Sequence, residues 1–216
     1  MSTWDLRANL GVSYKGSNYY TITALPYYLK RQKILLKLLK PYIKNSNLVC
    51  DFGCGDGFYI NYFKTRLKRA DYFYGIDISE EMLNKARSID PNNFYIVSEE
   101  GLKSLSKELN LDLVYSIAVF AHISDNLMDV IVQSIYDHLS QGCRLIVFEQ
   151  VAPFRYEGAS FTRRTIVDYK SKFSKFGFKV EKMTLVSFNS HRFFSVKLLN
   201  YIIDSSANQQ RILKCA

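Results

Sequence analysis

The stretch VCDFGCGDG, residues 49–57, places a carboxylate and three glycines directly after an apolar run. Asp51 precedes glycines at every second position from 53 to 57. Glycines at this spacing let the backbone turn tightly and approach a ligand closely. A dinucleotide site would favour the spacing GxGxxG, and an acid at Asp51 would oppose the pyrophosphate. The stretch therefore indicates a ligand that carries a cationic amine.

A second acid, Asp77, ends the next predicted strand, YFYGIDI. An acid in this place accepts hydrogen bonds from two ribose hydroxyls. An amino-acid head, a ribose and an adenine without phosphate occur together in S-adenosylmethionine, so these residues predict that cofactor. The alternatives are a plain strand–helix turn for the glycines and a helix cap for Asp77, although Ser79 is better placed to cap the helix.

Strands and helices alternate around these residues. Apolar runs predict strands in NLVCDF, YFYGIDI, NFYIVSEE, LDLVYSIAVF, CRLIVFEQV and FKVEKMTLVSF. Apolar residues at helical spacing predict helices over 30–43, where Pro41 ends or bends the helix, and in GFYINYFKTRLK, EEMLNKARSI, NLMDVIVQSIYDHL and TIVDYKSKFSKFG. The order predicts a single α/β domain with a Rossmann-like, doubly wound, mostly parallel sheet and helices on both faces. Ligands of such sheets bind beyond the carboxyl ends of the strands.

Four motifs in order, DFGCGDG, GIDIS, LDLVYSIAVFAHI and GCRLIVFEQ, resemble those of class I S-adenosylmethionine-dependent methyltransferases. The resemblance covers roughly residues 45–182. It implies a helical lid segment over 1–44 and a cofactor-binding core over 45–190. Residues 191–216 would complete the chain with a strand or amphipathic helix and a tail.

The resemblance also implies roles for matching positions. The glycine loop would hold the methionine part of the cofactor, Asp77 the ribose, and Ile78 with Met82 the adenine. The sequence VSEEG replaces the commoner Gly-Asp pair, so either of its two acids would meet the adenine amine. The implied cofactor-binding residues are Asp51, Gly53, Cys54, Gly55, Asp77, Ile78, Met82, Glu99, Glu100, Ser116 and Tyr19.

Methyl transfer from a sulfonium mainly requires that the acceptor be aligned and water excluded. A hydroxyl acceptor also benefits from a base, and His122 and Glu149 are the catalytic candidates because they follow the fourth and end the fifth predicted strand. His138, late in a helix, is predicted at the surface. Candidates for binding the substrate are the lid tyrosines and a group of arginines that suit a phosphate or carboxylate, with plain packing and solvated loops as the alternatives: Tyr14, Tyr20, Arg155, Arg163, Arg164 and His191.

The acceptor class is narrowed by motifs that the segment SIAVFAH lacks. It has neither the Asn/Asp-Pro-Pro-aromatic pattern of base N-methylation nor a Pro-Cys nucleophile. This form resembles the small-molecule branch of the family, and O-methylation of a sugar or glycan-linked group is the specific expectation. The alternatives are an RNA methyltransferase, supported by basic charge, and a non-catalytic cofactor-binding module.

The amino-acid composition and charge limit the kinds of partner that the sequence predicts. The net charge is +9, and residues 30–44 hold six basic residues and no acid. Such charge attracts nucleic acid, an anionic membrane face or an acidic substrate, or remains a solvated surface. The four cysteines are scattered without a CxxC pair, so no metal site is predicted and reduced thiols are expected. Neither a spanning segment nor a signal peptide is predicted, which favours the cytoplasm with peripheral membrane contact left open. Nucleic acid is not the expected partner.

Overall fold

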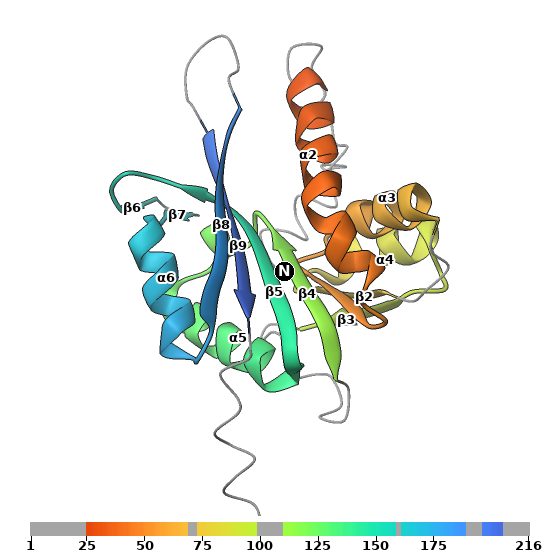
Figure 1. Ribbon diagram of the computed structural model, residues 1–216. Coiled ribbons are helices and arrows are strands. Elements are labelled where there is room, and N and C mark those ends of the chain that lie inside the picture. Colours follow the sequence, from red (N-terminus) through yellow and green to blue (C-terminus); the bar gives the residue numbers. More distant parts are fainter. Residues whose placement is uncertain (1–24, 69–72, 99–109, 159–160, 189–195, 205–216) are drawn as a thin grey trace, which may run out of the picture. The chain divides into compact units, whose positions relative to one another are not determined.

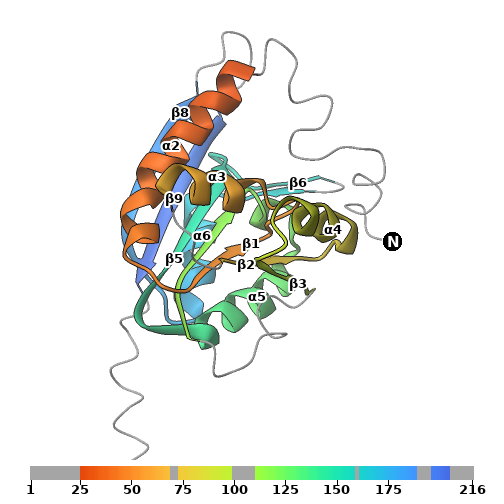
Figure 2. The ribbon, with the colours of Figure 1, turned by 90° about the vertical axis from the view of Figure 1, so that its right-hand side faces the viewer.

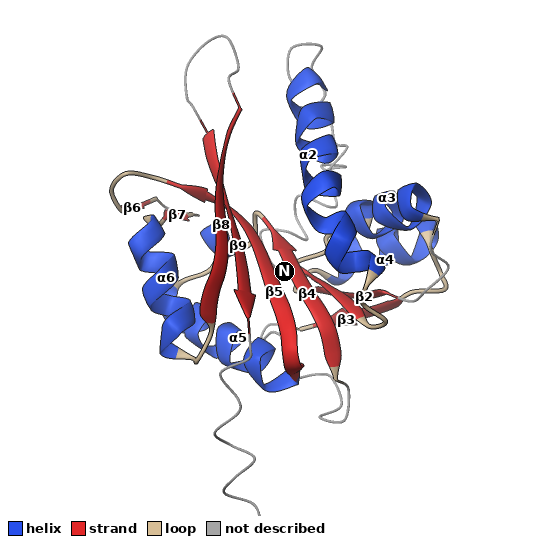
Figure 3. Cartoon of the chain, in the orientation of Figure 1, coloured by secondary structure: helices blue, strands red, loops and turns tan. Residues whose placement is uncertain are grey.

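The computed structural model describes residues 25–68, 73–98, 110–158, 161–188 and 196–204 (Figure 1). Its internal contacts divide the chain into two compact units, Met1–Glu99 and Glu100–Ala216. Each unit combines strands with helices, as the alternating sequence pattern predicts (Figure 3).

In the first unit, three parallel strands lie in the order β3-β2-β1. They are β1 (Val49–Phe52), β2 (Phe73–Asp77) and β3 (Phe94–Val97), and the helices are α2 (Leu25–Lys44), α3 (Phe58–Leu67) and α4 (Glu80–Ile89). Asp51 pairs with Gly75, and Asp77 pairs with Val97. The register therefore places the two predicted acids at the ends of neighbouring parallel strands.

Helix α2 contacts α3 (Figure 2). Leu35, Leu39 and Ile43 are at most 1% exposed, which explains the helical spacing of apolar residues in this segment. The helix continues through Pro41 to Lys44, so of the two expectations, that Pro41 ends or bends the helix, the first is wrong. Pro41 is exposed, and water can there satisfy the carbonyl that loses its intrahelical donor.

In the second unit, the strands lie in the order β4-β5-β9-β8. They are β4 (Leu111–Ile117), β5 (Leu139–Val151), β8 (Lys179–Phe188) and β9 (Val196–Asp204). Strands β4 and β5 are parallel, whereas β9 is antiparallel to both of its neighbours. Of the two alternatives for the C-terminal segment, the strand therefore holds for residues 196–204.

The other elements of this unit follow β4 and β5. A short 3₁₀ helix, η2 (Phe120–His122), precedes α5 (Asp125–His138), and a small hairpin of β6 (Tyr156–Glu157) and β7 (Thr162–Arg163) precedes α6 (Ile166–Lys175). The excursion between β5 and α6 closes on itself, because the Ala152 N–H donates to the Arg164 carbonyl at 3.1 Å.

Aromatic packing joins η2 to α6. The Phe120 and Phe173 rings meet edge to face at 5.7 Å, and both side chains are fully buried. His138 is also buried, so its predicted surface position is wrong. The reason is that α5 runs directly into β5 without a loop, and His138 Nδ1 lies 2.8 Å from the Ser134 carbonyl oxygen.

Candidate active site

The loop after β1 has the conformation that its glycines permit. Gly53, Gly55 and Gly57 have φ angles of 77°, 55° and 72°, which residues with a side chain rarely adopt. The N–H groups of Gly53 and Cys54 donate to the Ile76 carbonyl at 2.7 and 3.0 Å. The loop is thus fastened to β2, and its backbone is shaped for close approach by a ligand.

Asp77 contacts this loop directly. Its Oδ2 accepts the Gly55 N–H at 2.8 Å, and its Oδ1 accepts the Ser79 N–H at 3.0 Å. The side chain is partly exposed, and a carboxylate oxygen can accept more than one hydrogen bond. Ser79 caps α4 by accepting the Met82 N–H, which confirms its predicted place and leaves Asp77 beside the loop.

Other predicted cofactor residues lie around the same loop. Asp51 is 2% exposed and Ile78 is half-buried. Met82 Cε lies 3.5 Å from the point where a Cβ on Gly55 would stand, so Met82 borders the loop. Cys54 packs its Sγ against Gly75, and burial, with the nearby Asp51 charge, raises the pKa of this thiol. A raised pKa favours the neutral thiol of Cys54 over the thiolate.

Tyr95 on β3 supports the loop and was not singled out from the sequence. A Cβ on Gly75 would stand 2.6 Å from Tyr95 Cδ1, and one on Gly57 would stand 3.0 Å from the Tyr95 hydroxyl oxygen. Burial raises the pKa of Tyr95, which keeps the phenol neutral. The signal in the sequence was Gly75, because a glycine inside a strand often marks close approach of another group.

We expect Gly75→Ala to lower the free energy of unfolding by about 1–3 kcal/mol through overpacking against Tyr95. Tyr95→Ala in the same chain should remove the ring from this space, so the double variant should be more stable than the sum of the two single changes predicts, while the contact with Cys54 Sγ at 2.9 Å remains. Urea unfolding of the four proteins measures this coupling. Strict additivity would show that Tyr95 does not occupy the space above Gly75.

In the second unit, the segment after β4 is held by Glu149. Ala118 has a φ of 59°, unusual for a residue with a side chain, and its N–H donates to the Phe148 carbonyl at 2.8 Å. Glu149 Oε1 accepts the N–H groups of Val119 and Phe120 at 2.6 and 2.7 Å, and the Glu149 side chain is fully buried. The catalytic candidate Glu149 thus holds the backbone of this segment, whereas the candidate His122 is exposed and Ser116 is buried.

Arg164 holds the same segment from its carbonyl side. Its guanidinium is 0% exposed and donates to the carbonyls of Phe120 and Ile123, each at 2.6 Å. It also donates to Asp125 Oδ1 through Nε at 3.0 Å and Nη2 at 2.7 Å. Glu149 and Arg164 therefore fix the backbone between β4 and α5 from both sides.

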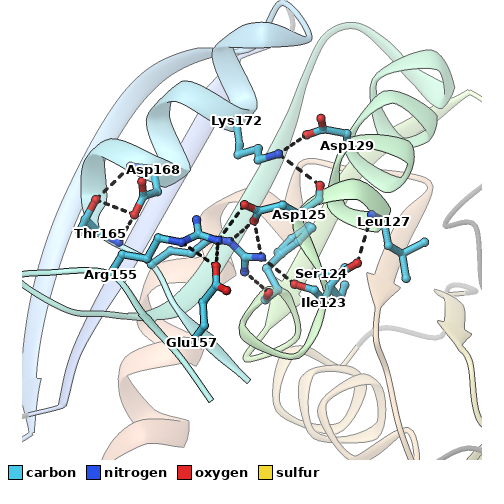
Figure 4. A network of polar contacts seen from close by, with 12 residues as sticks. Ile123, Ser124, Asp125, Leu127, Asp129, Arg155, Glu157, Thr165, Asp168 and Lys172 are labelled. Atoms are coloured by element: carbon cyan, nitrogen blue, oxygen red, sulfur yellow. Dashed lines mark hydrogen bonds and ion pairs between the residues drawn. The ribbon is translucent and has the colours of Figure 1, made fainter. Parts of the chain in front are cut away.

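Asp125 is the centre of the network drawn in Figure 4. Arg155 donates to its Oδ2 at 2.8 Å and also pairs with Glu157. Burial alone would raise the pKa of Asp125, but hydrogen bonds from Arg164 and Arg155 outweigh it and lower that pKa. Arg163, by contrast, is exposed, with its guanidinium 5.3 Å from the Phe161 ring centroid. The three arginines predicted to bind an anion thus have three different environments.

The first unit brings Asp51, Gly53, Cys54, Gly55, Asp77, Ile78 and Met82 together, and the second holds Ser116, His122, Glu149, Arg155, Arg163 and Arg164. Tyr14, Tyr19, Tyr20, Glu99, Glu100 and His191 lie outside the described residues. Across the described ranges, no three His, Cys, Asp or Glu side chains gather as metal ligands would. In the same ranges, no helix has the length and hydrophobicity that crossing a bilayer requires.

Comparison with known proteins agrees with this geometry. Residues 50–145 match a family model described as a methyltransferase domain. A comparison with curated protein sequences finds no significant match.

Solved structures share the fold at low sequence identity. An S-adenosylmethionine-dependent methyltransferase from Methanosarcina mazei aligns with a TM-score of 0.64 at 12% identity, covering 77% of this chain and 96% of that one. A protein from Pyrococcus horikoshii aligns with a TM-score of 0.69 at 18% identity, and the alignment covers 88% of this chain and 97% of that one. The magnesium protoporphyrin IX methyltransferase of Synechocystis with bound S-adenosylmethionine aligns with a TM-score of 0.61 at 18% identity. This alignment covers 87% of this chain and 86% of that one.

These likenesses confirm the resemblance that the ordered motifs indicated, and with it the predicted Rossmann-like fold class. Residues 50–145 therefore resemble a methyltransferase domain, and the chain has the mostly parallel, Rossmann-like fold of the S-adenosylmethionine-dependent methyltransferases with which it aligns.

Proposed function

We propose that the protein is an S-adenosylmethionine-dependent methyltransferase that acts on a small molecule. The observation that carries the proposal is the 2.8 Å contact of the Gly55 N–H with Asp77, since it joins the glycine loop to the acid predicted to bind ribose. The family match over residues 50–145 spans both motifs. The specific acceptor that we propose is a hydroxyl of a sugar or of a glycan-linked group.

The described residues fit such a cofactor. The glycines of the loop leave its backbone bare for the methionine part, and the partly exposed Asp77 carboxylate is of the type that accepts hydrogen bonds from ribose hydroxyls. Ile78 and Met82 would contact the adenine, and the buried Asp51 favours a cationic amine nearby. When bound, the cofactor supplies a methyl group on a positively charged sulfur. The remaining work of the chain is to orient the acceptor and exclude water.

Two residues of the second unit are proposed for the acceptor. His122 is exposed on η2, directly after β4, and can take a proton from a hydroxyl. Arg163 is exposed, and an arginine fork suits a phosphate or carboxylate on the acceptor. Arg155 and Arg164 already donate to Asp125, which leaves Arg163 as the favoured anion-binding residue of the three.

We expect Asp77→Ala to weaken S-adenosylmethionine binding by about 2–4 kcal/mol, because two charge-assisted hydrogen bonds to the ribose are lost. Isothermal titration calorimetry on the folded variant measures the change. Glu81→Ala is the matched control, since Glu81 is an exposed acid on the adjoining helix α4. Equal affinities of wild type and Asp77→Ala would rule out Asp77 as the ribose ligand.

The reaction is tested with S-adenosylmethionine carrying a tritiated methyl group. Transfer to sugars or to the small-molecule fraction of a cell extract would support the proposed class. Transfer to tRNA would favour the RNA methyltransferase instead. Tight cofactor binding without transfer to any fraction would favour a non-catalytic module of the same fold.

A further inference from the structure

The outer side of helix α2 carries a row of lysines. Lys30, Lys33, Lys37, Lys40 and Lys44 are all exposed. At 3.6 residues per turn they fall within an arc of about 80°, and at 1.5 Å per residue the row is about 21 Å long. We call these five residues the lysine face. It is a continuous strip of positive charge along four helical turns.

Charge is concentrated in this helix. It holds six basic residues and no acid, whereas the whole chain has a net charge of +9. Within the ranges that the structure describes, none of the five lysines makes an ion pair or a hydrogen bond. The opposite side of the helix is already used, because Leu35, Leu39 and Ile43 are buried. The lysine face is therefore the side that α2 offers to a partner.

We propose that the lysine face docks the protein on an anionic lipid bilayer. Clusters of four to eight basic residues on an amphipathic helix attract anionic lipid headgroups. A planar layer of headgroups needs positive charge rather than oriented donor groups, and the lysine ammonium is such a point charge. Leu29, 47% exposed beside the first lysine, adds apolar contact at one end of the row.

A nucleic acid fits this surface less well. Proteins that hold single strands combine positive charge with aromatic side chains on which bases stack, and base readout favours arginine. From residue 29 to residue 44, the exposed positions are Leu29, Pro41 and the lysine face alone. Among the fully exposed positions that the structure describes on this helix there is no arginine and no aromatic residue, and such a convex row of lysines matches a flat anionic surface better than it matches a strand with bases.

The test is sedimentation of the full chain with vesicles of phosphatidylcholine alone or mixed with phosphatidylglycerol. The wild type should bind only the mixed vesicles, and added salt should release it. Lys33→Gln/Lys37→Gln/Lys40→Gln should lower the partition coefficient about 100-fold, because each lysine near the surface contributes about fivefold to binding.

The matched control is Lys170→Gln/Lys179→Gln/Lys182→Gln, which removes the same charge from exposed lysines of the second unit. It should change binding by less than about fivefold in total.

The charge-preserving variant Lys33→Arg/Lys37→Arg/Lys40→Arg should bind like the wild type, which separates loss of charge from loss of fold. Melting temperatures of the two α2 variants should agree with that of the wild type, because exposed glutamine and arginine are good helix formers. Equal losses in the two glutamine variants, or no binding to mixed vesicles, would overturn the proposal. So would tighter binding to a single-stranded oligonucleotide that depends on the same three lysines.

Discussion

Gly55→Val is expected to abolish S-adenosylmethionine binding while the protein stays folded. Gly55 has a φ of 55°, and a Cβ there would already stand 3.5 Å from Met82 Cε. The two further methyl groups of valine have to enter the space beside the loop, where we propose that the methionine part of the cofactor lies. We expect affinity to fall at least about 100-fold, as measured by calorimetry. The strained backbone should cost about 1–3 kcal/mol of stability.

Gly142→Val is the matched control for that strain. Gly142 has a φ of 77°, and nothing lies within 4 Å of the point where its Cβ would stand. The control should lose a similar amount of stability and keep wild-type affinity for the cofactor. A folded Gly55→Val protein that binds the cofactor as tightly as the wild type would sink the proposed cofactor role of the loop.

The second large effect is expected in stability. Arg164→Met should lower the free energy of unfolding by about 3 kcal/mol, because the buried carbonyl of Phe120 and the Asp125 carboxylate lose their donor. We place the effect at the lower end of the range for broken buried pairs because the Asp125 side chain is 34% exposed and retains Arg155. For a chain of this size, the melting temperature should fall by about 6–12 °C.

Arg155→Met is the control, since Arg155 donates to the same aspartate from the exposed side of the network. Exposed pairs contribute about 0.2–1 kcal/mol, so this change should be small. If the two variants lose equal stability, the buried bonds of Arg164 to the segment after β4 do not stabilise the fold.

The parts of the fold that sequence predicts well are those decided by near neighbours. Ser79 caps the helix that starts one residue later, and the loop glycines adopt the left-handed conformation that their spacing implies. Gly55 and Asp77, which are in contact, lie 22 residues apart in the sequence. Their proximity could still be expected, because the order of the motifs resembles that of a known family. The two predicted acids could thus be placed at the same edge of a mostly parallel sheet, whereas the order of its strands was not predicted.

Long-range packing is what the sequence could not give. From the sequence, Arg164 was predicted as a loop residue that binds an anion, and Glu149 as a catalytic candidate at the end of a strand. Neither prediction includes their partners, because no residue near them in the sequence indicates those contacts. Those partners lie 41 to 44 residues away for the Arg164 carbonyl contacts, and 29 to 30 away for Glu149. Tyr95 and His138 were missed for the same reason, since burial depends on elements that only the folded chain brings near.

The closed excursion between β5 and α6 has a consequence for evolution. Its two ends are joined by the Ala152–Arg164 hydrogen bond, and Arg164 itself is anchored to the backbone of η2. A loop whose ends are fixed in this way can gain, lose or exchange residues at small entropic cost. Related chains can therefore diverge between residues 153 and 163 while the turn after β4 keeps its shape. Under the proposed function, selection for new acceptors would act first on this stretch, and Arg164 would separate such changes from the turn after β4.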